Sequence, residues 1–155
     1  MSRGEPAVIQ AGGIAIAGRA VLILGEPGLG KSSLALALID RGAVLIGDDG
    51  VRLEVADGRL LASPPPHIAG LIEVRNVGLI TRPTASRVPV ALALRLDPAA
   101  PRLPEAAERI DLLGQPIPLL RLWPGSPVLA LRAEAALSQW GLYFAAPAPH
   151  IDEVS

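Results

Sequence analysis

The chain contains no cysteine, few aromatic residues and a single lysine. The lack of cysteine excludes disulfides, thiolate metal sites and cysteine nucleophiles, and it is consistent with a reducing compartment. Aromatic residues make up 3% of a sequence that is half hydrophobic, so the core must consist mainly of leucine, isoleucine, valine and alanine. The formal net charge of −1 gives no long-range attraction to nucleic acid or to an anionic membrane, and we expect neither as a partner.

Long apolar runs are also missing. The most apolar stretch, residues 14–24, is interrupted by Arg19 and is shorter than the roughly 20 residues that cross a bilayer. The N-terminus lacks the basic region and apolar stretch of a signal peptide, so the sequence predicts a cytoplasmic protein. Its 155 residues are the usual size of one domain. We therefore expect one domain over residues 1–155, with a loose tail at about 145–155.

Apolar runs and turn residues alternate along the chain and predict an α/β fold. One helix is expected over residues 32–41 with Gly42 as its C-terminal cap, and another from Ser126 as N-cap and Pro127 to Trp140, followed by Gly141. Loops are expected at residues 82–86 and 97–108. Strands are expected at residues 8–11, 14–16, 20–24, 43–46, 51–55, 59–62, 71–74, 88–96 and 117–122.

A phosphate-binding loop pattern lies between the third expected strand and the first helix. Glycines allow its backbone N–H groups to point at phosphates, and the start of the helix adds a positive dipole end. Lys31 would reach the β- and γ-phosphates of a nucleoside triphosphate, and the Ser32 hydroxyl would ligate magnesium. Lys31 is the only lysine among fourteen basic residues, which supports a need for a compact ammonium group there. The predicted nucleotide-binding residues are Gly25, Glu26, Pro27, Gly28, Leu29, Gly30, Lys31, Ser32 and Ser33.

Three further acidic residues are candidate site residues. Asp48 and Asp49 follow the strand that comes directly after the phosphate-loop helix. A strand–helix–strand unit is expected to be parallel, so both strand ends should lie at one edge of the sheet. One carboxylate could then bind magnesium through water and the other accept a proton, or the pair could be a solvated acidic turn. Glu73 alternates with Leu71 and Arg75 on one face of its strand, which alone predicts an exposed surface.

In this order and spacing, four segments make the chain resemble the catalytic domain of HPr kinase/phosphorylase. They are GEPGLGKSSLALALIDRGA, IGDDGVRL, LIEVRNVGLI and RLPEAAERIDLLGQPIP, and the resemblance runs from about Ile9 to the last helix. It implies a central mixed sheet with a phosphate loop of the PEP carboxykinase kind. Longer family members carry an extra N-terminal domain.

The resemblance also implies site roles. ATP would be held by the phosphate loop, with Lys31 on its phosphates and Ser32 on Mg2+. Asp49 would match the proton acceptor in phosphorylation, and Asp48 its neighbour near the metal. Glu73 would match a magnesium-associated carboxylate. Arg102, twelve residues before Gly114, would match a catalytic arginine on a mobile loop. The implied acceptor is a serine of a small HPr-like phosphocarrier, and the implied assembly is a homo-oligomer, by analogy a hexamer.

Three positions depart from the family pattern. Gln10 stands where a histidine is usual, Asn76 follows Arg75 where the family has glycine, and residues 122–126 lack the arginines of longer members, leaving only Arg121 nearby. The first and third are expected to slow reverse phosphorolysis more than the kinase reaction. Two alternatives remain open. One is a nucleotide-binding regulatory module without turnover, which Gln10 favours. The other is a phosphate-loop kinase that acts on a small molecule, and the lack of a recognisable second nucleotide site or lid helix in the sequence weighs against it.

Overall fold

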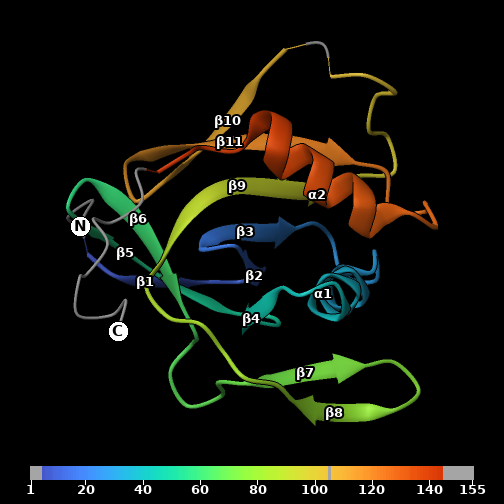
Figure 1. Ribbon diagram of the computed structural model, residues 1–155, viewed down its shortest axis with the longest axis horizontal. Helices are drawn as coiled ribbons and strands as arrows, with labels where there is room; N and C mark the ends of the chain where they lie inside the picture. Colours follow the sequence, from blue (N-terminus) through green and yellow to red (C-terminus); the bar gives the residue numbers. More distant parts are fainter. Residues whose placement is uncertain (1–4, 105, 145–155) are drawn as a thin grey trace, which may run out of the picture.

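The computed structural model describes residues 5–104 and 106–144. They form a large curled sheet, a small two-stranded sheet and two helices (Figure 1). The expected tail at 145–155 lies outside the described residues. The elements are β1 (Ala7–Ile9), β2 (Gly12–Ile16), β3 (Arg19–Leu24), α1 (Lys31–Asp40), β4 (Val44–Gly47), β5 (Val51–Ala56), β6 (Arg59–Ser63), β7 (Leu71–Val74), β8 (Gly78–Thr81), β9 (Val88–Leu96), β10 (Glu108–Leu112), β11 (Gln115–Leu122) and α2 (Leu129–Trp140).

The large sheet is mixed, as the sequence predicts. Its strands run in the order β1-β5-β6-β9-β3-β2-β4, and β9 also pairs in parallel with β11, which pairs antiparallel with β10. β3 and β9 are parallel. β2 lies between β3 and β4 and is antiparallel to both, so β3 and β4 point the same way without being neighbours. The strand ends that flank the phosphate loop and Asp48 therefore lie at one edge of the sheet.

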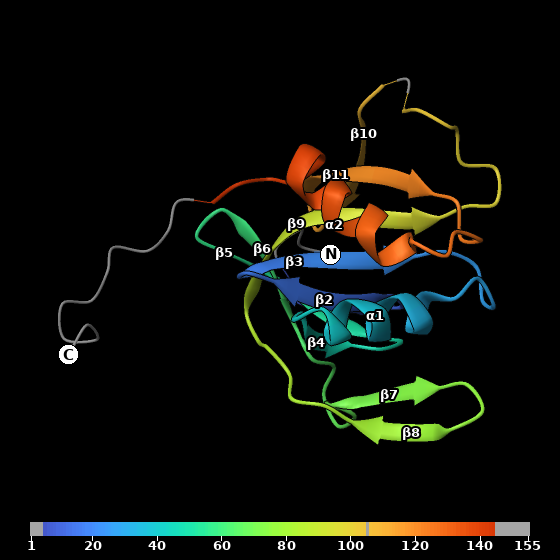
Figure 2. The same cartoon turned by 45° about the vertical axis from the view of Figure 1, so that its right-hand side comes forward.

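β3 is buried on both of its faces. Val21 and Ile23 pack in a cluster with α1 and α2, while Leu22 and Leu24 pack in a second cluster with β5, β6 and β11. Burying both faces accounts for the uninterrupted apolar run that the sequence shows there. The strand is thus held rigidly from two sides, and the phosphate loop begins directly at its end. α1 lies between α2 on one side and the β7–β8 hairpin on the other in both views (Figures 1 and 2).

The boundaries of both helices test the capping predictions. α1 ends as expected: Gly42 has φ of 106°, and the N–H groups of Gly42 and Ala43 donate to the carbonyls of Ile39 and Leu38, which is the Schellman arrangement. α2 ends at Trp140 as expected, but the predictions for its N-cap and for the backbone of Gly141 are wrong. Its N-cap is Val128, because the Ser126 hydroxyl accepts a bond from Val128 N at 3.1 Å and closes a turn before the helix. Gly141 is extended, with φ of −72°.

Two strands were not predicted. β8 pairs with β7 in the separate hairpin, and β10 pairs with β11. β8 contains exposed Leu79 and Gly78 and shows no apolar alternation, and β10 begins at the residue where the expected loop ends. Among the described residues, no helix is long and apolar enough to cross a membrane.

Candidate active site

The phosphate loop connects β3 to α1 and has the backbone that its glycines require. Gly28 has φ of 85° and Gly30, the N-cap of α1, has φ of 96°. An L side chain would be strained at either position. A Cβ atom there would meet nothing within 4 Å, so the backbone conformation, and not a lack of space, is what requires glycine. The loop lines a cavity beside the N-terminus of α1, where free N–H groups and the helix dipole favour an anionic group.

Lys31 lies across this loop. Its Nζ donates to the carbonyl oxygens of Gly25 at 2.7 Å and Glu26 at 3.1 Å. These two predicted binding residues therefore contribute their backbone to Lys31. The ammonium group is held at the inner side of the loop, where it can exchange carbonyl partners for phosphate oxygens.

Asp48 links three parts of the site. Its Oδ1 accepts a bond from the Ser32 hydroxyl at 2.6 Å, and its Oδ2 accepts a bond from the backbone N–H of Glu73 at 2.9 Å. One carboxylate thus ties the first turn of α1 to the turn after β4 and to the β7–β8 hairpin. The turn itself needs Gly47, because a Cβ atom there would collide with the carbonyl oxygen of Gly50. This arrangement makes the solvated acidic turn the weaker interpretation of Asp48.

A cavity of about 390 Å³ brings most of the predicted residues together. Asp49 and Glu73 lie on its wall with Lys31, and so does Gln10, the residue at the usual histidine position. Arg75, which directly follows β7, also lines the cavity and was not predicted as a site residue, although the sequence pattern places it on the same face as Glu73. The lining residues are Gln10, Pro27, Gly28, Leu29, Gly30, Lys31, Ser32, Ser33, Asp48, Asp49, Glu73 and Arg75.

Arg102 lies elsewhere. It lines a separate cavity of about 920 Å³ together with Trp123 and Arg132, and it is absent from the lining of the Lys31 cavity. The structure therefore does not place Arg102 beside the phosphate loop, and its predicted catalytic role stays a prediction.

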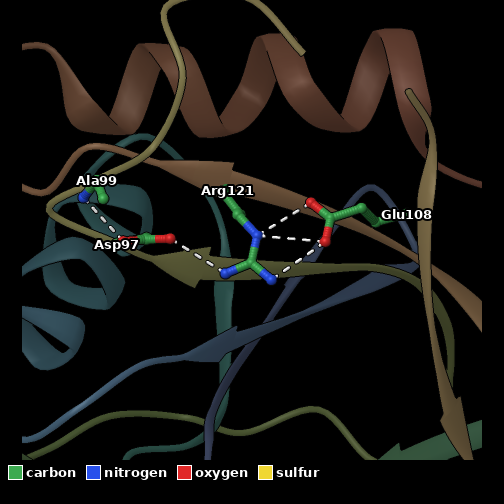
Figure 3. Close-up of polar contacts among 4 residues, drawn as sticks. All are labelled: Asp97, Ala99, Glu108 and Arg121. Atoms are coloured by element: carbon green, nitrogen blue, oxygen red, sulfur yellow. Dashed lines mark hydrogen bonds and ion pairs between the residues drawn. The ribbon is translucent and has the colours of Figure 1, made fainter. Parts of the chain in front are cut away.

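The loop that carries Arg102 is fixed at both of its ends by Arg121 (Figure 3). Nη1 of Arg121 donates to Asp97 Oδ2 at 3.1 Å, and Nε lies 3.0 Å from Glu108 Oε2. The backbone N–H of Ala99, which bonds Asp97 Oδ1 at 2.8 Å, and then Arg121 lower the pKa of the Asp97 carboxyl. Hydrogen bonds from Arg121 to Glu108 and Asp97 raise the pKa of the guanidinium. No local sequence pattern indicates this contact, because its three residues are far apart in the chain.

The side chains fit a magnesium ion that arrives with a nucleotide. No group of three or more histidine or acidic side chains that could hold a metal by itself occurs within residues 5–104 and 106–144. Magnesium usually keeps several waters and takes one or two protein ligands together with substrate phosphates. Ser32 and Asp48, joined at 2.6 Å, provide a hydroxyl and a carboxylate of the kind that phosphate-loop enzymes use.

Comparisons with known proteins agree with this geometry. The family model described as HPr Serine kinase C-terminal domain matches residues 7–85. HPr kinase/phosphorylase of Cupriavidus pinatubonensis is 37% identical over 139 residues, which cover 79% of this chain and 42% of that protein. The enzyme of the same name from Clostridium botulinum strain Eklund 17B is 48% identical over 65 residues, covering 42% of this chain and 21% of its own length.

A solved structure shares the fold. The Hpr(Ser) kinase/phosphatase from Coxiella burnetii matches with a TM-score of 0.71 and 27% sequence identity, over 86% of this chain and 93% of that one. The chain spans less than half the length of the curated relatives it matches. With a family model that covers half of its residues, the chain belongs to the HPr serine kinase C-terminal domain family.

Proposed function

We propose that the protein is an ATP-dependent kinase that transfers the γ-phosphoryl group to a serine hydroxyl of a small HPr-like phosphocarrier. The observation that carries the proposal is the bond of 2.6 Å between Ser32 and Asp48. It joins the phosphate-binding loop to the carboxylate of Asp48, and the neighbouring Asp49 lines the same cavity as Lys31. A phosphate loop with a positioned carboxylate beside it is the minimum that phosphoryl transfer to a hydroxyl requires.

The nucleotide would be bound by the backbone of residues 25–33. Lys31 would leave the carbonyls of Gly25 and Glu26 and contact the β- and γ-phosphates, and Ser32 with Asp48 would hold the ion. Magnesium supplies charge neutralisation on the phosphate oxygens when it is bound. Glu73 lines the same cavity and would bind one of the waters of the ion.

Asp49 would act as the general base. As the serine oxygen of the acceptor bonds to the γ-phosphorus, its proton would pass to the Asp49 carboxylate and the bond from phosphorus to the bridging oxygen of ADP would break. Arg102 would stabilise charge on the transferred group only if the loop over residues 97–107 approaches Lys31 in the complex with the acceptor. Its cavity in the present structure is a different one.

The test is incubation of the protein with labelled ATP, magnesium and a candidate HPr-like phosphocarrier. Transfer of label to a serine of the acceptor supports the proposal. Lys31→Ala is expected to abolish transfer and weaken ATP binding, and Lys31→Arg is also expected to fail because a planar guanidinium does not fit the same cradle. Unchanged turnover in Lys31→Ala would refute the phosphate-loop assignment.

A second candidate is a nucleotide-binding module without turnover. Gln10 favours it, because this side chain lines the cavity of Lys31 and lacks the titratable proton of an imidazole. ATP binding with no transfer to any offered acceptor, under conditions where a full-length family member does transfer, would favour the module.

We also propose a homo-oligomer, by analogy a hexamer, that acts in the cytoplasm with its phosphocarrier. The β7–β8 hairpin supports self-association, because Val77 and Leu79 are 72% and 66% exposed on a ribbon that projects from the main sheet (Figure 1). Exposed apolar side chains grouped in this way are typical of interaction surfaces. Sedimentation of the protein and of Leu79→Glu tests the idea, which fails if wild type is monomeric at micromolar concentration.

A further inference from the structure

A second cavity, also about 390 Å³ in volume, adjoins the phosphate loop on its other side. It lies between α1 and the segment 124–131 that leads into α2. It shares Leu29, Gly30 and Ser33 with the cavity of Lys31 and the carboxylates. The two cavities are therefore neighbours on either side of the phosphate loop, one toward the β7–β8 hairpin and the other toward α2, and these two elements lie on opposite sides of α1 (Figures 1 and 2).

The positions of Lys31 and Asp48 fix the direction of a bound triphosphate. Lys31 contacts the β- and γ-phosphates in phosphate-loop proteins, and the adjacent hydroxyl holds the ion. Lys31 and Ser32 line the cavity that also contains Asp48 and Asp49. The γ-phosphate of a bound nucleotide therefore points toward these two carboxylates. The α-phosphate and the nucleoside then leave in the opposite direction, past Ser33, which lines both cavities.

The second cavity has the chemistry of a slot for a flat apolar group. Its wall is mostly aliphatic or backbone, with Ala37 on α1 and Pro127 opposite. Val128 and Leu131 line it and are 44% and 47% exposed, which leaves apolar surface at its mouth. The guanidinium of Arg41 is bound to Glu134 through Nε at 2.9 Å and Nη2 at 2.8 Å, so its donors point to α2.

We propose that this second cavity binds the nucleobase of the triphosphate. The inference rests on the proposed function, because it assumes that the phosphate loop holds the triphosphate of a nucleotide. Base recognition there is by apolar contact, since few polar side chains are available to distinguish one purine from another. ATP and GTP should therefore bind within about threefold of each other, and inorganic tripolyphosphate, which lacks a base, should bind at least about tenfold more weakly than ATP.

Ala37→Leu tests the assignment, because leucine is a good helix former and its side chain would fill the slot from α1. Calorimetry in the presence of magnesium should show that the ATP dissociation constant of Ala37→Leu rises about tenfold. The dissociation constant for tripolyphosphate should stay unchanged. Ala135→Leu is the matched control: Ala135 lies on the exposed side of α2 and lines neither cavity, so ATP binding should be unaltered. Circular dichroism checks that both variants fold.

A second readout does not depend on the variants. In the wild-type protein, ATP but not tripolyphosphate should shift the NMR methyl signals of Val128 and Leu131. Equal affinity of wild type for ATP and tripolyphosphate, or equal weakening of both by Ala37→Leu, would overturn the base site and leave the proposed function standing. Failure of wild type to bind either ligand would overturn the proposed function and the base site together.

Discussion

Arg121 and Glu108 form a paired contact in which Nε lies 3.0 Å from Oε2 and Nη2 lies 3.1 Å from Oε1. The remaining nitrogen, Nη1, bonds Asp97 at 3.1 Å. Asp97 follows β9 and Glu108 opens β10, so one guanidinium joins the two ends of the loop that carries Arg102. In the sequence, Arg121 is also the arginine nearest to residues 122–126. Because its donors are used in this contact, it is a poor substitute for the arginines of longer family members.

Replacing Arg121 should loosen that loop. In Arg121→Met the carboxylates of Asp97 and Glu108 lose their shared donor, so amide hydrogen exchange over residues 97–104 should become faster. If Arg102 acts from this loop, the rate of phosphoryl transfer should fall about tenfold, with little change in ATP affinity. Hydrogen exchange read by mass spectrometry and steady-state kinetics check the two effects.

Arg109→Met is the matched control. Arg109 is the next residue of β10 and is exposed, and it takes no part in the Asp97–Arg121–Glu108 contact. It should leave exchange in the loop unchanged. Equal exchange rates in wild type and Arg121→Met would show that the contact does not hold the loop.

The same contact predicts a pH dependence. The pKa of Asp97 lies below its ordinary value of 3.8 in the folded protein, owing first to the Ala99 N–H and then to Arg121. A carboxyl whose folded pKa is lowered stabilises the fold above its unfolded pKa, and that contribution is lost as pH falls through the folded value. The contribution is therefore complete at neutral pH and disappears only below about pH 4.

Carbon NMR of the Asp97 carboxyl tests this directly. Its titration midpoint in the wild type should lie below 3.8. In Arg121→Met it should move upward but remain lowered, because the Ala99 N–H still donates to the carboxylate. A wild-type midpoint at or above the ordinary value would contradict the structure of the loop.

The sequence predicts the phosphate-loop unit well because all its determinants are local. The buried strand, the glycines and Lys31 follow one another, and the strand–helix–strand rule places Asp48 at the same edge of the sheet. The insertion of β2 between β3 and β4 depends on pairings between distant segments, which no local pattern encodes. The same reason explains why the separate cavity of Arg102 and the contacts of Arg121 were not predicted.

Asp48 and Asp49 should respond differently to the same amide substitution. Asp49→Asn is nearly isosteric and cannot accept a proton, so turnover should fall by about two or more orders of magnitude with ATP affinity nearly intact. Asp48→Asn places an amide NH2 where the carboxylate accepts bonds from Ser32 and from the N–H of Glu73. It should weaken magnesium-dependent ATP binding and speed amide exchange at Glu73.

Kinetics at varied magnesium concentration separate the two roles. If Asp48→Asn removes turnover while keeping ATP and magnesium affinity, and Asp49→Asn does not remove turnover, the roles assigned to the two residues are exchanged.

Gln10 determines the last prediction, which concerns the reverse reaction. Its side chain lines the cavity of Lys31, so it can donate a hydrogen bond to a phosphate oxygen and help position the substrate. It has no proton that titrates near neutral pH, unlike the histidine that the family usually has there. The direction that suffers most should be the one that must activate inorganic phosphate and protonate the leaving serine oxygen.

We therefore expect a protein that phosphorylates its partner and reverses the modification slowly or not at all. The measurement is the rate of pyrophosphate release when the serine-phosphorylated phosphocarrier is incubated with the protein, phosphate and magnesium. This rate is compared with the forward rate in the same preparation. Gln10→His should raise the reverse rate more than the forward rate if the missing imidazole is the cause. Release by the wild type at a rate comparable to the forward reaction would show that Gln10 and the loop at 122–126 are tolerated substitutions, and that Arg121, although bound to Asp97 and Glu108, does not limit the reverse direction.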